Sequence, residues 1–105
     1  MDRAMRMLVC FDLPVTTVRE RRDYSLFRKN LMEAGFYMMQ ESVYVKLIPT
    51  PSTKIYIEKY LKSIVPSKGL VQILVITEKQ FGNICTIVGN TKTEFINSTE
   101  KVIFV

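Results

Sequence analysis

The chain has 105 residues, of which 48% are apolar and 24% are charged, and its formal net charge is +5. This length and composition fit one ordinary globular domain with a modest core. Histidine is absent, which excludes histidine-dependent nucleophilic and general-base catalysis and the usual zinc ligand sets. No run of 18 apolar residues occurs, so we expect no membrane span and a cytoplasmic protein.

The charge balance indicates an anionic partner, nucleic acid first. The two cysteines, Cys10 and Cys85, lack metal-ligand spacing, and Cys10 is interpreted as a small buried hydrophobe in a reducing compartment. Any bound metal would have to be held by carboxylates and water. Such ligands suit a hard ion such as Mg²⁺ or Mn²⁺.

The first predicted element is a strand over residues 5–12, "MRMLVCFD". Both of its faces are apolar until the last residue, Asp12, so the strand should be central in its sheet. Alternation assigns Met7, Val9 and Phe11 to one face and Leu8, Cys10 and Asp12 to the other.

A helix is predicted from about Val18 to Ala34. Thr17 and Glu20 have the spacing of a capping box, and Gly35 is a natural helix terminator. One helical face is apolar, formed by Tyr24, Phe27, Leu31 and Ala34. Arg22, Lys29 and Glu33 fall on the opposite side.

Residues 36–48 are strand-like, and "QES" divides them into two short strands. Thr50 and Pro51 then predict the start of a second helix, which Pro66 ends. Residues 68–77 form another strand that is apolar on both faces. We expect further β-strands in "NICTIVGN" and "KVIFV", so that about 1–78 is the core and about 79–105 a β tail for dimer and partner contacts.

This order gives an α+β fold, the ferredoxin-like βαββαβ sandwich, as a single domain over 1–105. Both helices cover one face of the sheet, yet the sheet is apolar on both sides. A second copy of the chain is the simplest cover for the other face, which predicts a face-to-face homodimer. The tail strands could add to the partner's sheet edge.

Asp12 can be interpreted in two ways. An Asp before Leu-Pro is good turn chemistry, but the end of a central strand also often faces a cleft. One carboxylate cannot bind Mg²⁺ tightly by itself. If the two first strands end near the dyad of a dimer, two Asp12 side chains converge and either share a divalent ion or repel each other.

The basic residues of the predicted first helix are either a solvated face or phosphate contacts. Aromatic residues are not interleaved with them, so base stacking is not supported and duplex binding through phosphates fits better. Gln40, Ser42, Tyr44 and Lys46 alternate along a strand and share one face, which the usual alternation would expose. The candidate nucleic-acid-binding residues are Arg19, Arg21, Arg22, Lys29 and Lys46.

Several short motifs occur in a specific order: "FDLP" ends the first strand, then "RERRDYSLFRKNL", "GF", "QESVYVKL" and "TEKQF" follow. In this order and spacing the chain resembles the CRISPR-associated protein Two family, from Met5 to Val105 and most closely its type II members. Many members of this family run further at the C-terminus, so less tail is left here for partner contacts.

The resemblance implies a prokaryotic ferredoxin-like homodimer flanked by dimers of the integrase CRISPR-associated protein One. Such a dimer would hold duplex prespacer DNA for insertion at CRISPR leader-repeat DNA, with other type II system proteins as further partners. The family is also described as metal-dependent endonucleases, and its metal-binding aspartate falls on Asp12. A scaffold is favoured over a Mg²⁺- or Mn²⁺-dependent phosphodiesterase, because a nuclease usually gathers several carboxylates. A ferredoxin-like regulatory or toxin-type domain rests on fold analogy alone.

Overall fold

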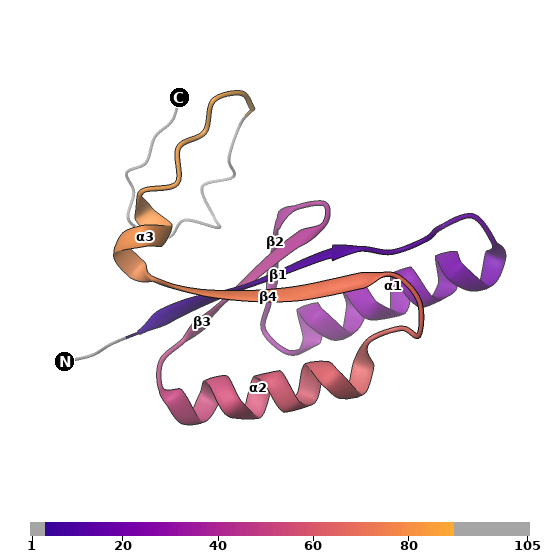
Figure 1. Cartoon of the computed structure of the whole chain (residues 1–105), viewed down its shortest axis with the longest axis horizontal. Coiled ribbons are helices and arrows are strands. Elements are labelled where there is room, and N and C mark those ends of the chain that lie inside the picture. The colour runs from indigo at the N-terminus through magenta and orange to yellow at the C-terminus, as the bar shows by residue number, and fades with distance from the viewer. Residues whose placement is uncertain (1–3, 90–105) are drawn as a thin grey trace.

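The structure, a computed structural model, describes residues 4–89 as one four-stranded sheet with two long helices and one short helix (Figure 1). The sheet order is β2-β3-β1-β4, and every neighbouring pair is antiparallel. This is the predicted ferredoxin-like order, with β1 in the interior. The elements are β1 (Met5–Asp12), α1 (Val18–Glu33), β2 (Tyr37–Gln40), β3 (Val43–Ile48), α2 (Pro51–Ile64), β4 (Leu70–Thr77) and α3 (Glu78–Gly82).

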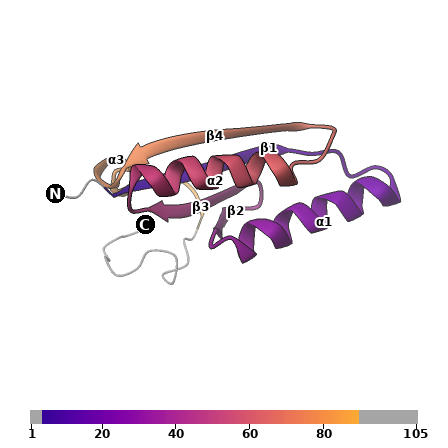
Figure 2. The ribbon, with the colours of Figure 1, turned by 90° about the horizontal axis from the view of Figure 1, so that it is seen from below.

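The core lies between α1, α2 and one face of the sheet (Figure 2). The predicted alternation along β1 is confirmed, because Met7, Val9 and Phe11 are buried against the helices. The predicted stripe on α1 is confirmed too, since Phe27 and Leu31 are buried in the same cluster. The opposite face of the sheet, here called the open face, contains Leu8, Cys10 and Asp12 from β1 and their register partners Leu74, Gln72 and Leu70 from β4.

Local capping fixes where the helices begin and end. The Thr17 hydroxyl accepts a hydrogen bond from the Glu20 N–H at 3.0 Å, and the Glu20 carboxylate accepts one from the Thr17 N–H at 3.0 Å. Thr50 accepts a hydrogen bond from the Thr53 N–H at 3.2 Å at the start of α2. Gly35 follows α1 with φ of 100°, the left-handed conformation that favours glycine.

The predicted β tail is wrong over the part that the structure describes. The chain turns at once from β4 into α3, which Thr77 caps by accepting a hydrogen bond from the Gln80 N–H at 3.0 Å. The strand expected in "NICTIVGN" does not form as far as Gly89, the last residue described. The run "KVIFV" lies outside the described residues. Among residues 4–89, no helix is long and apolar enough to cross a bilayer.

Candidate nucleic-acid interface and the Asp12 strand end

Asp12 ends β1 with its side chain exposed on the open face, opposite Leu70. A close backbone contact fixes the Asp12 corner, which is the place where β1 ends and β4 begins. A Cβ added to Gly69 would lie 2.8 Å from the Asp12 carbonyl oxygen and 2.7 Å from Leu13 Cδ2. Gly69 also has φ of 96°. The absence of a side chain at Gly69 therefore allows the end of β1 and the start of β4 to approach each other.

The surroundings of Asp12 do not make a metal site within one chain. No group of three or more Asp, Glu, Cys or His side chains that could hold a metal ion occurs among residues 4–89. Mg²⁺ is usually held by one or two carboxylates together with waters and substrate phosphates. The described residues of a single copy gather no such cluster around Asp12, so by themselves they do not fit a resident divalent ion.

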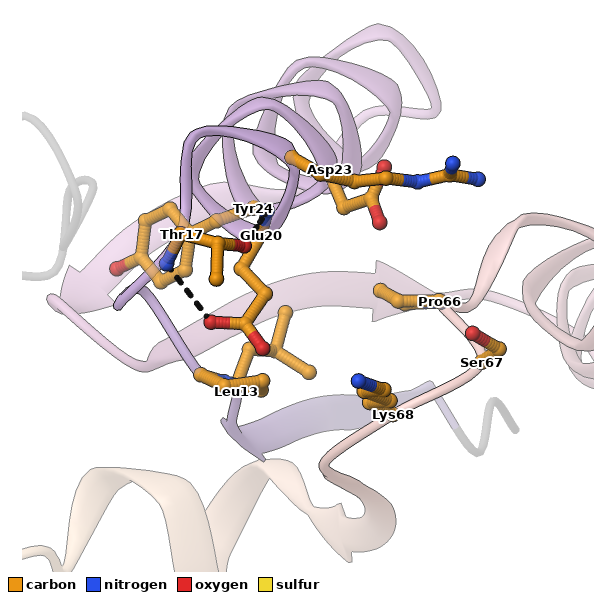
Figure 3. Close-up of a pocket in the computed structure, with 10 residues that line it drawn as sticks. Leu13, Thr17, Glu20, Asp23, Tyr24, Pro66, Ser67 and Lys68 are labelled. Atoms are coloured by element: carbon orange, nitrogen blue, oxygen red, sulfur yellow. Dashed lines mark hydrogen bonds between the residues drawn. The ribbon is translucent and has the colours of Figure 1, made fainter.

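A cavity of about 310 Å³ lies beside this corner, between the loop after β1, the first turns of α1 and the loop before β4 (Figure 3). Glu20, Leu13 and Lys68 all line the cavity, and a dashed line joins the Glu20 carboxylate to the Thr17 backbone (Figure 3). Arg19 and Asp23 also line the cavity. Its lining therefore carries charges of both signs.

Glu20 is held by the turn that starts α1. Its carboxylate accepts hydrogen bonds from the N–H groups of Thr16 at 2.9 Å and Thr17 at 3.0 Å. The hydrogen bond from the Thr17 backbone is the main cause that lowers the pKa of Glu20, and the nearby positive charge of Lys68 acts in the same direction. Glu20 thus stays ionised at neutral pH as part of the helix cap.

The predicted nucleic-acid-binding residues separate into two groups. The Arg21 guanidinium donates hydrogen bonds to the carbonyls of Val15 at 3.1 Å and Thr16 at 2.8 Å, so it holds the loop before α1. Lys29 forms an exposed ion pair with Glu33 at 3.9 Å. Arg19 and Arg22, by contrast, are exposed on α1 and form no ion pair with any described residue.

Lys46 and Tyr44 do not lie on the exposed face that alternation suggested. Tyr44 pairs in register with Val9, faces the helices and is fully buried, and its hydroxyl accepts a hydrogen bond from Arg28 Nε at 2.7 Å. Lys46 shares that face. A Cβ on Gly35 would lie 2.5 Å from Lys46 Nζ, which places the ammonium group at the C-terminal end of α1. The prediction that this face is exposed was wrong, because a tyrosine can be buried when its hydroxyl group keeps a hydrogen-bond partner.

Sequence reasoning missed the contacts that hold α3. The Arg6 guanidinium pairs with the Glu78 carboxylate, donates a hydrogen bond to Tyr37 Oη at 2.8 Å and lies 4.6 Å from the centre of the Phe81 ring. The capping-box spacing of Thr77 and Gln80 could have revealed α3 itself. The Arg6 contacts had no such signal, because their partners lie far away in the sequence.

Comparisons with known proteins identify the family. The model of the family described as "CRISPR associated protein Cas2" matches residues 5–84. The chain belongs to the Cas2 family. It is 43% identical to a "CRISPR-associated endoribonuclease Cas2" of Treponema denticola, a match that covers 94% of this chain and 98% of that one. A protein of the same name from Ligilactobacillus salivarius is 44% identical over the same shares of the two chains.

A solved structure described as "Crystal structure of cas2" matches the fold with a TM-score of 0.53 and 24% identity, and the match covers 95% of this chain and 99% of that one. At this identity the likeness concerns the fold only. It agrees with the ferredoxin-like order of β1 to β4. The assignment to the Cas2 family and to CRISPR adaptation in general therefore rests on the sequence matches.

Proposed function

We propose that this Cas2-family chain acts in spacer acquisition as a dimeric scaffold. In this proposal it binds duplex prespacer DNA and bridges dimers of the integrase CRISPR-associated protein One for insertion at leader-repeat DNA of a type II system. The observation that carries the proposal is that two arginines of α1, Arg19 and Arg22, are exposed and form no ion pair with any of residues 4–89. Arginine forks without an internal acidic partner are available to phosphate oxygens.

The overall charge supports the same function. The chain has 15 Lys and Arg residues against 10 Asp and Glu residues, so an anionic duplex is attracted before any specific contact forms. Arg19 also lines the cavity together with Lys68, so α1 and the loop before β4 both offer cations. Arg21, Lys29 and Lys46 have internal roles, so we assign them a smaller share of DNA binding.

The DNA-binding part is tested with the double variant Arg19→Ala, Arg22→Ala. We expect weaker binding to short duplexes of any sequence. The slope of the logarithm of the binding constant against the logarithm of the salt concentration should fall in magnitude by about two, near one for each phosphate that is no longer neutralised. The matched control is Lys59→Ala, Lys62→Ala, which removes the same charge from α2. Equal weakening in both variants, measured by fluorescence anisotropy over a salt series, would show that only net charge matters and would contradict this interface.

A second function is favoured by one specific observation: the curated relatives are named endoribonucleases. In this alternative Asp12 is a ligand of Mg²⁺ or Mn²⁺. Because residues 4–89 of one copy hold no cluster of three or more candidate ligands, the alternative has a second copy bring its own Asp12 to the same place. The scaffold is preferred because it needs no further carboxylates.

The variant Asp12→Asn decides between the two functions. If the chain is a scaffold, the variant retains duplex binding, assembly with the integrase and spacer integration. If it is a nuclease, the variant loses cleavage of RNA or duplex DNA that the wild type shows with Mg²⁺ or Mn²⁺. Loss of integration while dimer and DNA binding remain intact would refute the scaffold and make Asp12 essential to the chemistry.

A further inference from the structure

The outer face of α2 has large apolar side chains where a solvated helix normally has polar ones. Ile55 is 66% exposed and Tyr56 is 68% exposed. The core side of the same helix is already filled by Ile57 and Leu61, which are 5% and 2% exposed. Two adjacent large apolar residues in water are informative, because single exposed ones are common but paired ones mark contact sites.

Positive charge surrounds this pair. Lys59 lies four residues after Ile55 and three after Tyr56, so it occupies the same side of the helix between them, and Lys62 follows one turn later. The acidic residue of α2, Glu58, precedes Lys62 by four residues and so borders the same side of the helix, but its carboxylate is paired with Lys54 at 2.9 Å. Ile55, Tyr56, Lys59 and Lys62 are called the α2 outer face below; it contains no acidic residue.

The geometry points to the α2 outer face as a docking site for an acidic, amphipathic segment of another protein. Tyrosine is a preferred anchor at protein interfaces, and Ile55 would be buried beside it. The two lysines form no ion pair with any described residue, and they would meet carboxylates of the incoming segment and fix its register.

Other occupants fit less well. A second copy of this chain packed on the same face would bring Lys59 and Lys62 against identical lysines, and like charges repel. A nucleic-acid backbone would satisfy the lysines but would leave Ile55 beside phosphates, where burial of an aliphatic side chain gains nothing. This docking site shares no residue with Arg19 and Arg22 of the proposed DNA interface, so the two proposals can fail separately.

The test uses the full-length chain and a labelled synthetic peptide that presents leucine on one helical face and glutamate on the other. Binding is measured by fluorescence anisotropy and located by amide chemical shifts. The variants are Ile55→Ser with Tyr56→Ser, and Lys59→Gln with Lys62→Gln. The matched control is Val18→Ser with Leu26→Ser, which removes two exposed apolar side chains from α1.

We expect the peptide to shift the amides of residues 55–62 and to lose affinity by about tenfold or more in the Ile55, Tyr56 variant. The lysine variant should also weaken binding, and the α1 control should not. The proposal is overturned if the peptide does not bind, if a basic peptide of the same pattern binds equally well, or if the Ile55, Tyr56 variant binds unchanged. Duplex DNA that shifts the same amides would assign the face to nucleic acid and overturn it as well.

Discussion

Single residues at the Asp12 corner show how little space the fold leaves there. Gly69 faces the carbonyl of Asp12 and the side chain of Leu13, and it adopts a backbone conformation that other residues avoid. The corner thereby fixes where β1 stops and β4 begins. An exposed carboxylate is thus held on a precise backbone, although its neighbours on the open face are apolar.

The variant Gly69→Ala tests this contact. The added Cβ would meet Asp12 and Leu13 at less than 3 Å in a left-handed conformation, so we expect a loss of roughly 1–3 kcal/mol in unfolding free energy. Gly82→Ala is the matched control, because nothing lies within 4 Å of its added Cβ; it should be neutral or stabilise by up to about 1 kcal/mol. Urea denaturation measures both. Similar unfolding free energies of the two variants would show that a side chain at position 69 does not clash with Asp12 and Leu13.

Basic side chains were the hardest residues to place from the sequence. Lys46 and Arg21 were predicted to contact DNA, since a basic side chain looks the same in the sequence whether it faces a phosphate or its own backbone. In the structure Arg21 donates hydrogen bonds to the carbonyls of Val15 and Thr16, and the Lys46 ammonium group lies at the end of α1. Arg19 and Arg22 are exposed and have no ion pair within the described part of the chain, and their predicted contact with DNA stays a prediction.

At the scale of elements, the start of α1 combines a helix cap with one wall of the cavity. Glu20 accepts hydrogen bonds from two backbone N–H groups that the helix itself cannot satisfy. The same carboxylate lies near Lys68 from the loop before β4, so the cap also joins two loops electrostatically.

The lowered pKa of Glu20 predicts how the stability of this cap depends on pH. A carboxylate with a depressed folded pKa stabilises the fold above its unfolded value of about 4.3, and the contribution is lost as the pH falls toward the folded value. The melting temperature of Glu20→Ala should therefore lie below that of the wild type at pH 7, and the gap should narrow in acid. The control, Glu33→Ala, should show little change at either pH. A difference in melting temperature that is the same in acid as at pH 7 would contradict a stabilising role for the ionised Glu20 carboxylate.

Most elements were predictable because their signals are local. The apolar period, the caps at Thr17 and Thr50 and the turn at Glu41 each lie within a few residues of the boundary they set. After Thr77 the prediction failed in two places: the capping box at Thr77 starts α3 over Glu78–Gly82, and the β-branched residues of "NICTIVGN" form no strand as far as Gly89. A strand needs a neighbour to pair with, which residue preference alone does not supply.

At the scale of the whole molecule, the open face is apolar and only partly covered by the described residues. Leu70 and Leu74 of β4 are 55% and 54% exposed. β4 is also an edge strand, and none of its residues is charged or a proline. Edge strands of natural proteins usually contain charged residues or proline, which prevent pairing with other chains. An uncharged edge strand beside an apolar face therefore favours pairing with another chain.

The predicted dimer can be tested with Leu74→Lys. A charge in the middle of the open face should make the chain sediment as a monomer at micromolar concentration while its circular dichroism spectrum is retained. Leu26→Lys is the matched control, because Leu26 on α1 is 53% exposed and lies on the helix layer; it should leave the dimer intact. A wild-type monomer, or a Leu74→Lys variant that still dimerises, would contradict the use of this face.

The fastening of α3 has a consequence for protein engineering. Arg6 contacts Glu78 and Phe81 from within the sheet, so the chain leaves the folded body at one fixed point, just after Gly82. That point is a suitable junction for chimaeric proteins. Segments taken from different relatives could be joined there while the core stays as it is, and each chimaera would present a new terminus from the same position. Such chimaeras would share one sheet and one set of arginines, so any difference between them would come from the exchanged segment.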